Sequence, residues 1–208
     1  DFAASDPRFD ILNEVLDQVK RLDKTVNDML FFGKPSPPEF VYADINAILN
    51  KTLVFASQYK GGKNIEKKLD IAEGLPYVYV DPKQMQQVFL NLILNAFQAM
   101  PGGGELTLVT EMANVADKPI VRISIADTGE GIPEQVLGKL FTPFFTTKAQ
   151  GTGLGLAICH KIVSQHNGTL AVLSECGKGT KFIIDLPGVQ RGDARFGLSH
   201  SANEILDV

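Results

Sequence analysis

The sequence has 208 residues, of which 44% are hydrophobic and 21% are charged, and its formal net charge is -4. That length is enough to bury a sizeable core and predicts one full domain with a smaller part attached. A sequence pI near 5.4 and the lack of a basic stripe exclude a general nucleic-acid binder, because neutralising a phosphate backbone requires clustered lysine and arginine.

The sequence carries no signal for membrane insertion or secretion. No apolar run approaches the roughly 20 residues that a membrane span needs, and no signal peptide opens the chain. Cys159 and Cys176 are too few for a disulfide framework, and neither has a neighbouring residue that suggests zinc. We therefore expect a cytoplasmic domain without a membrane segment. A membrane anchor elsewhere in the full-length protein is compatible with this expectation.

The first part of the chain predicts a long amphipathic helix over residues 6–32. Its apolar residues alternate at spacings of three and four, which is typical of a heptad seam. They are Leu12, Val15, Val19, Leu22, Val26 and Met29. Because the other face is polar, the seam needs helical partners, and we expect a dimerising bundle. A helix that lies on its own domain is the alternative.

The stretch "GKPSPPEF", residues 33–40, marks a boundary between two parts of the chain. Gly33 suits a C-terminal cap, and the prolines that follow it forbid a continuing helix. The predicted divisions are a helical segment over 1–34, a linker over 35–43, a main domain over 44–187 and a tail over 188–208. The tail has little periodicity, and no role is predicted for it.

Within the main domain, capping residues and apolar periodicity predict the helices. Asp44 suits the N-cap of the first, and Asp81 before Pro82 is a strong start signal for the second. The predicted helices are 45–59, 82–100, a short one after Pro133, and 155–165.

The remaining stretches of this domain read as strands. The predicted strands are 65–71, 77–80, a hairpin of 105–113 with 119–127, and a last hairpin of 169–175 with 180–187. Because strands and helices do not alternate regularly, we predict an α+β fold. It is a two-layer α/β sandwich with a mixed, mainly antiparallel sheet, preceded by the long bundle-type helix.

The helix that follows Asp81 has an unusual polar face. Gln87, Asn91, Asn95 and Gln98 line it, whereas a merely solvated face normally uses glutamate and lysine, which favour helices more than asparagine does. Asn91 and Asn95 are spaced i, i+4, so their oxygens can converge on a hard cation such as Mg²⁺. Two ordinary surface asparagines are the alternative interpretation.

A second candidate site is the stretch "ADTGEGIP", residues 126–133. Asp127 ends a strand pattern, and its carboxylate can accept a hydrogen bond from an exocyclic amine such as that of adenine. Gly129 and Gly131 would let the backbone approach a flat ring closely. Taken alone, an aspartate in a turn is most often only a turn.

The third candidate is the glycine-rich stretch "FFTTKAQGTGLGLA", residues 144–157. Gly151, Gly153 and Gly155 permit positive φ, so backbone N–H groups and the next helix N-terminus can point at phosphate oxygens. Thr146, Thr147 and Lys148 lie just upstream and could supply hydroxyls and a cation. The phenylalanines Phe141, Phe144 and Phe145 are expected to anchor this stretch, which would act as a lid.

Four motifs in this order resemble one known family. "NLILNAFQAM", "DTGEGIP", "LFTPFFTTK" and "GTGLGLAI" are similar to the N, G1, F and G2 boxes of the sensor histidine kinase catalytic domain, in the GHKL ATP-binding superfamily. "GKGTKFIIDLP" is similar to its closing hairpin, so the resemblance covers residues 41–187. Residues 6–40 resemble the second helix and linker of the dimerisation and phosphotransfer bundle of the nitrogen-regulation and sporulation-kinase type.

The resemblance implies ATP and Mg²⁺ as cofactors. It implies that Asn95 holds the metal with Asn91 assisting, that both act in catalysis together with Lys148, and that Asp127 reads the adenine amine. Lys148 would compensate for Gln98, since relatives often carry a cation at that place. The implied nucleotide-binding set is Asn91, Asn95, Gln98, Asp127, Gly129, Gly131, Ile132, Phe141, Thr146, Thr147, Lys148, Gly151, Thr152, Gly153, Leu154, Gly155, Leu156 and Thr180.

The resemblance also implies an acceptor histidine, and His160, His166 and His200 do not lie in the family's acceptor context. The function expected is therefore transfer of the γ-phosphate to a histidine on a bundle helix not present in this chain. The implied partners are that bundle, a cognate response regulator and a second copy in a full-length homodimer. A gyrase-like ATPase is one alternative, disfavoured because Asn91 stands where those relatives carry glutamate. An ATP-binding sensor or scaffold module without phosphotransfer is another.

Overall fold

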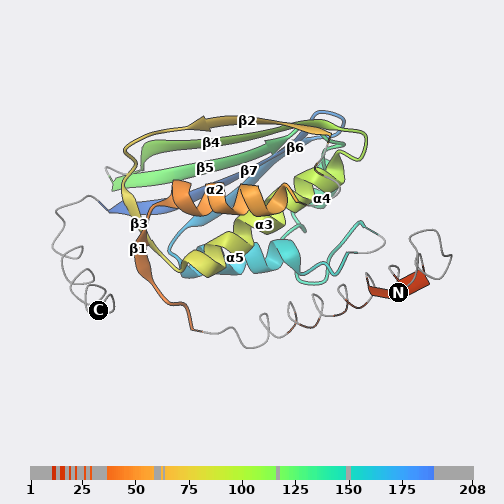
Figure 1. Ribbon diagram of the computed structural model, residues 1–208, viewed down its shortest axis with the longest axis horizontal. Helices are drawn as coiled ribbons and strands as arrows, with labels where there is room; N and C mark the ends of the chain where they lie inside the picture. The colour runs from red at the N-terminus through yellow and green to blue at the C-terminus, as the bar shows by residue number, and fades with distance from the viewer. Residues whose placement is uncertain are drawn as a thin grey trace, which may run out of the picture.

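The protein folds as a sheet covered on one face by helices (Figure 1). The computed structural model describes residues 11–12, 15–16, 19, 22, 26, 29, 37–58, 62, 64–115, 118–148 and 151–189. Within these residues, seven strands form one sheet in the order β1-β3-β7-β5-β4-β2, and β6 pairs with β7 beside that path. The two-layer α+β sandwich predicted from the sequence is confirmed.

Most of the sheet is antiparallel. The strands are β1 (Val41–Ala43), β2 (Ile65–Ile71), β3 (Tyr77–Val80), β4 (Gly104–Val115), β5 (Lys118–Asp127), β6 (Thr169–Glu175) and β7 (Gly179–Val189). The β4–β5 and β6–β7 hairpins form as predicted, and β5 also pairs with β7 in the centre of the sheet. The pair β2 and β4 is parallel, so the chain crosses the sheet between them.

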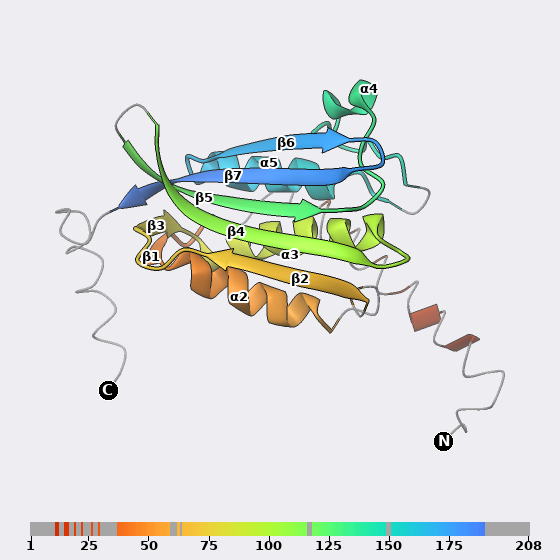
Figure 2. The same cartoon turned by 90° about the horizontal axis from the view of Figure 1, so that it is seen from above.

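In the described part of residues 37–189 there are four helices: α2 (Ile45–Ala56), α3 (Pro82–Ala99), α4 (Glu134–Leu137) and α5 (Gly155–Gln165). Asp44 and Asp81 are the N-caps of α2 and α3, and each carboxylate accepts hydrogen bonds from two backbone N–H groups of the first turn. Figure 2 shows α2, α3 and α5 side by side beneath the sheet. The predicted helix starts at 45, 82 and 155 are therefore confirmed.

The core lies between this helical layer and the sheet. Helix α3 contributes its apolar face, including Val88, Phe89 and Leu92, which are fully buried. Leu106 and Leu108 of β4, with Ile123 and Ile125 of β5, face it from the sheet, at alternate positions along each strand. Burying the apolar face of α3 leaves its amide face at the edge of the layer, where it forms part of the site below.

Strand β1 was not predicted. Val41, Tyr42 and Ala43 pair antiparallel with Val80, Tyr79 and Val78 of β3, in the part of the chain predicted to be linker. At the other end of the domain, Gly188 and Val189 extend β7 beyond the predicted strand. Both additions arise from long-range pairing with β3, which local patterns in the sequence do not reveal.

The N-terminal seam is described only at scattered positions. Residues 11, 12, 15, 16, 19, 22, 26 and 29 are helical, and their apolar side chains are 46% to 65% exposed. The other residues of the predicted helix, and the tail from residue 190, lie outside the described residues. Among the helices of the described part, none is long and apolar enough to cross a membrane.

Candidate functional site

The amide face of α3 binds the ammonium group of a lysine side chain. Lys148, which precedes the glycine-rich stretch, donates from Nζ to Asn95 Oδ1 at 3.2 Å and to Gln98 Oε1 at 2.7 Å. Asn91 and Asn95 are half-buried and Gln98 is exposed. These contacts bring the amide face against a residue 50 or more positions away in the sequence.

Asp127 lies at the end of β5, and its side chain is directed by the backbone around it. Its Oδ1 accepts hydrogen bonds from Gly129 N at 2.9 Å and from Thr180 N at 3.2 Å. Only 9% of the residue is exposed. Burial raises the pKa of this carboxyl, while the two N–H groups and the charge of Lys148 oppose that rise. Oδ2 has no hydrogen-bond partner among the described residues, so it is the oxygen left for a ligand.

Gly129 and Gly131 are required by close contacts with the protein backbone. A Cβ on Gly129 would lie 2.6 Å from the carbonyl oxygen of Ala99, at the end of α3. A Cβ on Gly131, whose φ is +69°, would lie 2.1 Å from the carbonyl oxygen of Glu175. The predicted close approach is thus to backbone of α3 and β6, and it brings the Asp127 turn against the end of the amide face.

The same turn is tied to the closing hairpin by hydroxyl groups. Ser174 Oγ accepts a hydrogen bond from Ile132 N at 2.8 Å and bonds Thr180 Oγ1 at 2.9 Å. Ile132 and Thr180 were predicted from the resemblance, and the structure brings both to Asp127. Ser174 was missed, because a serine within an alternating strand gives no distinctive signal in the sequence.

The glycine-rich stretch lies beside α3, but it does not use its glycines as predicted. Only Gly153 has a positive φ, at +68°, while Gly155 begins helix α5 and Gly151 packs against Thr146. A Cβ on Gly153 would lie 2.4 Å from the carbonyl carbon of Phe144, whose N–H donates to the Gly153 carbonyl oxygen at 3.0 Å. A Cβ on Gly155 would lie 3.9 Å from Asn91 Oδ1, so the start of α5 faces the amide face.

Local hydrogen bonds shape the turns on either side. Thr146 Oγ1 accepts from Lys148 N at 3.1 Å, and Thr152 Oγ1 accepts from Leu154 N at 3.3 Å. Thr147 is exposed, Leu154 is fully buried and Leu156 is half-buried. The hydroxyls of Thr146 and Thr152 thus accept hydrogen bonds within their own turns.

The expected phenylalanine anchors are only partly correct. Phe141 packs its ring against His160 with the ring centroids 5.1 Å apart. Phe144, by contrast, is 61% exposed and has a φ of +66°, an uncommon conformation for a bulky residue. It is held there by its backbone bond to Gly153 rather than by burial of its ring.

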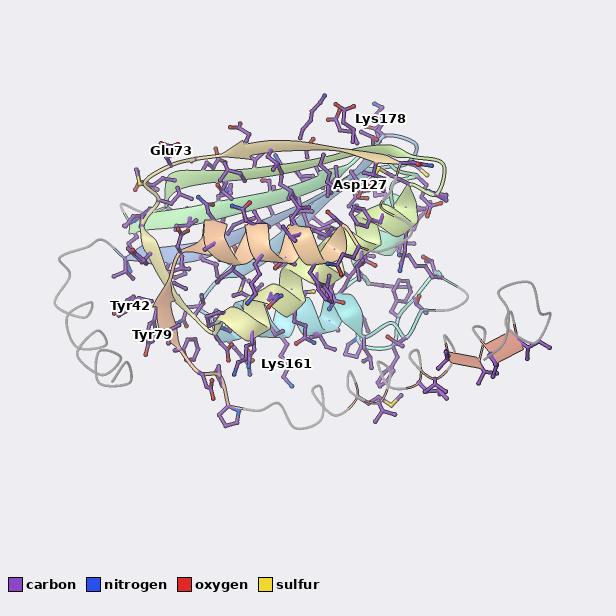
Figure 3. All side chains as sticks on the ribbon, viewed as in Figure 1. Tyr42, Glu73, Tyr79, Asp127, Lys161 and Lys178 are labelled. Carbon is purple, nitrogen blue, oxygen red and sulfur yellow. The ribbon has the colours of Figure 1, made fainter. Side chains whose placement is uncertain are left out.

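Three groups predicted separately therefore meet at one end of the domain: the amide face of α3, the Asp127 turn and the start of α5. Figure 3 places Asp127 at this end, with Tyr42 and Tyr79 at the opposite end. A cavity of about 500 Å³ lies elsewhere; it is lined by Asp44, Asn46, Gly74, Leu75, Pro76, Tyr77 and Met112. None of those residues was predicted to be in the site.

The fold and this site define an α+β nucleotide-binding domain, and comparison with known proteins gives its family. The model for histidine kinase-, DNA gyrase B- and HSP90-like ATPases matches residues 80–190. Because this match covers more than half of the sequence, the chain belongs to that family. The matched range includes every residue of the predicted nucleotide site.

The similar curated proteins are sensor kinases. Sensor histidine kinase ZraS of Escherichia coli (strain K12) is 39% identical over 170 residues, which cover 82% of this chain and 36% of ZraS. Sporulation kinase E of Bacillus subtilis (strain 168) is 34% identical over 183 residues, or 88% of this chain and 24% of that protein. The chain thus spans about a third or less of the length of these relatives.

Solved histidine kinases share the fold. The catalytic domain of ThkA is 32% identical with a TM-score of 0.63, covering 72% of this chain and 96% of that one. ShkA in complex with AMPPNP is 25% identical with a TM-score of 0.72, and the match covers 91% of this chain and 41% of ShkA. ThkA in complex with the response regulator TrrA is 26% identical with a TM-score of 0.72, and the match covers 90% of this chain and 53% of that one. The described domain therefore has the fold of the histidine kinase ATP-binding part.

Proposed function

We propose that this chain is the ATP-binding catalytic part of a two-component sensor histidine kinase, which transfers the γ-phosphate of ATP to a histidine on a helix bundle. The observation that carries this proposal is the meeting of the amide face of α3, the buried carboxylate of Asp127 and the glycine turn before α5 at one end of the domain. The names of the relatives and the AMPPNP bound to ShkA support it.

Adenine would be read by Asp127. Its Oδ1 is occupied by the N–H groups of Gly129 and Thr180, so Oδ2 would accept from the exocyclic amine of adenine. Guanine has a carbonyl oxygen at that place and would meet the carboxylate with an acceptor. The side of this pocket would be completed by Ile132, with Gly131 holding the turn in place.

Magnesium would be held by Asn95, with Asn91 assisting. Asn95 Oδ1 already accepts from the ammonium group of Lys148, so this oxygen suits positive charge, and neutral amide ligands suit an ion whose charge is balanced by phosphates. When bound there, Mg²⁺ would supply positive charge that neutralises the phosphates. Gln98 stands where relatives often carry a cation, and Lys148, which contacts its oxygen, would supply that positive charge to the phosphates.

The remaining predicted residues would enclose the phosphates. The start of α5 lies beside Asn91, and its backbone N–H groups, at the positive end of the helix dipole, would bind phosphate oxygens there. The residues proposed to form this lid and its supports are Phe141, Thr146, Thr147, Gly151, Thr152, Gly153, Leu154, Gly155 and Leu156.

In the proposed reaction, a histidine nitrogen of the bundle attacks the γ-phosphorus. The bond from phosphorus to the β,γ-bridging oxygen breaks, a phosphorus–nitrogen bond forms, and ADP leaves. The domain's own residues orient ATP and exclude water rather than exchange protons. Asn91 stands where ATP-hydrolysing relatives carry glutamate, so this chain lacks a general base for water at that position, which favours transfer to a protein.

The partners proposed are the acceptor-histidine bundle, a response regulator and a second copy of the kinase. ThkA in complex with TrrA supports a response regulator. We assign residues 1–34 to the second helix of the bundle, 35–43 to the linker and 44–187 to the catalytic domain. The exposed apolar side chains at positions 11–29 would pair with other bundle helices in a homodimer. The two free cysteines suit the reducing cytoplasm.

An Asn95→Ala variant tests this proposal, with Asn50→Ala on the exposed face of α2 as the matched control. We expect Asn95→Ala to abolish Mg²⁺-dependent binding of an ATP analogue, measured by titration calorimetry, and Asn50→Ala to leave it unchanged. Labelled ATP and a separate acceptor-bundle protein then test transfer. Label on the acceptor histidine is the expected result; steady ATP hydrolysis without acceptor would instead support an ATPase, and bound but untransferred ATP a sensor module.

A further inference from the structure

The end of α5 is tied to the start of α3 by a buried histidine. His166, only 2% exposed, lies with Nε2 at 2.9 Å from Asp81 N and Nδ1 at 2.7 Å from the Ile162 carbonyl oxygen. A backbone N–H can only donate, so Nε2 is the acceptor and Nδ1–H donates to Ile162. The ring therefore joins the last turn of α5 to the residue that caps α3.

Asp81 joins a third segment to this pair. Its Oδ1 accepts from Lys83 N at 2.8 Å and Gln84 N at 3.1 Å, which caps α3. Its Oδ2 accepts from Glu39 N at 2.9 Å. One carboxylate thus holds both the first turn of α3 and the chain that enters the domain through residues 37–40.

Aromatic packing holds the same entering segment. The ring of Phe40 stacks on Tyr79 with centroids 5.3 Å apart and an interplanar angle of 19°, and it lies tilted on His166 at 4.9 Å. An ion pair from Lys83 Nζ to Glu39 Oε2 measures 3.3 Å, but both side chains are about four-fifths exposed or more, so it adds little. We call the cluster of Glu39, Phe40, Tyr79, Asp81 and His166 the joint.

Both helices that leave the joint reach the proposed nucleotide site. Helix α3 begins next to Asp81 and carries Asn91 and Asn95 further along, while α5 begins at Gly155 and ends next to His166. Figures 1 and 3 show α3 and α5 running from the end that holds Tyr42 and Tyr79 toward the end that holds Asp127. A helix moves as a rigid rod, so a shift of α5 at the site displaces His166 at the joint.

We propose that His166 is a positioning residue that couples docking of residues 37–40 on the joint to nucleotide binding at the other ends of α3 and α5. This inference rests on the proposed function, because it requires ATP at that site. Nucleotide contacts at the start of α5 favour one placement of the helix, and that placement aligns Nε2 with Asp81 and the ring with Phe40. The segment that docks is the one that connects the N-terminal helix to the catalytic domain.

Coupling of this kind is reciprocal. If bound ATP raises the equilibrium constant for docking of residues 37–40 by some factor, docking raises the affinity for ATP by the same factor. If His166 only stabilised the fold, its replacement would lower stability and leave these two factors unchanged. Loss of the nucleotide response in a folded His166 variant therefore separates a positioning role from a structural one.

The test measures hydrogen exchange of the Glu39 amide in the full 208-residue chain, with and without an ATP analogue and Mg²⁺. We expect the nucleotide to slow this exchange about fivefold or more. Phe40→Leu, which removes the ring contacts, is expected to speed exchange and to weaken ATP binding. Lys83→Gln is the control: it removes the exposed ion pair to Glu39 but keeps the backbone N–H that Asp81 accepts, and is expected to change neither quantity.

Two variants of His166 complete the test. His166→Phe keeps a ring but cannot accept from Asp81, and we expect it to bind ATP while Glu39 exchange no longer responds. His166→Gln places an acceptor near Nε2 and is expected to restore part of the response. If His166→Phe fails to fold, Phe40→Leu still decides. Binding of ATP with unchanged Glu39 exchange in the wild-type chain would overturn the coupling alone. No binding of ATP at all would overturn the proposed function and the coupling with it.

Discussion

Replacing Asp127 by asparagine should invert the base preference of the nucleotide site. Oδ1 of Asp127 already takes two backbone N–H groups, from Gly129 and Thr180. In the Asp127→Asn variant the amide oxygen has to keep those two donors, so the NH₂ group takes the place of Oδ2. This NH₂ group and the exocyclic amine of adenine are both donors, so no hydrogen bond can form between them.

The size of the effect follows from the hydrogen bond that is lost. A hydrogen bond to a charged group contributes about 1.5 to 3 kcal/mol, which corresponds to a loss of about 10- to 150-fold in affinity for ATP. Inosine triphosphate carries a carbonyl oxygen at the same place, and a new neutral hydrogen bond contributes about 0.5 to 1.5 kcal/mol. The variant should therefore bind it about 2- to 12-fold more tightly than the wild type does.

Competition calorimetry with the two nucleotides measures this directly. Asp185→Asn is the matched control, because Asp185 lies on the same sheet but pairs with Arg122, and it should leave both affinities unchanged. Equal losses for both nucleotides in Asp127→Asn would show that the variant damages the site generally. Unchanged ATP affinity would show that Asp127 does not read the base, and either result would refute the reasoning.

Three further predictions concern pH, the lid turn and the sheet. Burial raises the pKa of Asp127 above its ordinary value of 3.8, so ATP affinity should fall on acidification at a higher pH than an exposed aspartate would produce, and Asp127→Asn should lack that dependence. Because the folded pKa is the higher one, this group's contribution to stability is present below the ordinary value and is lost as pH rises through the raised pKa; urea unfolding of both proteins across that range checks the sign. Gly153→Ala places a Cβ 2.4 Å from the carbonyl carbon of Phe144 at a φ of +68° and adds about 1 to 2 kcal/mol of backbone strain. It should lower the urea midpoint and weaken ATP binding, whereas Gly138→Ala, where nothing lies within 4 Å, should change neither. Arg122→Met breaks a bidentate pair with Asp185 at 2.7 and 2.8 Å and should lower stability by about 1 kcal/mol, a fall of roughly 2 to 4 °C in Tm, without altering ATP affinity; an unchanged melting curve would contradict it.

Elements with strong local signals could be predicted from the sequence. Asp81 before Pro82 combines an N-cap with a residue preorganised for the first turn, and the helix begins there. The two long hairpins alternate apolar and polar residues around short turns. Strand β1 has only three residues, and it exists because β3 pairs with it, so no local pattern could reveal it.

The site was predictable in its components but not in its contacts. The i, i+4 spacing of Asn91 and Asn95 indicated a shared ligand, yet the contact of Lys148 with Asn95 joins residues 53 apart and depends on tertiary packing. Gly131 was expected to let the backbone approach a flat ring, and its close contact with the backbone of β6 depends on tertiary packing that the sequence does not reveal. His166 gave no functional signal in the sequence, because its partners Asp81 and Phe40 lie 85 and more residues away.

A crystal structure of this chain with an ATP analogue and Mn²⁺ tests the central claim most directly. The account predicts an anomalous manganese peak bound to Asn95 Oδ1, the adenine amine on Asp127 Oδ2, and the phosphates between α3 and the start of α5. An analogue bound elsewhere, for example in the cavity beside Tyr77 and Met112, or a metal without contact to Asn95, would contradict it.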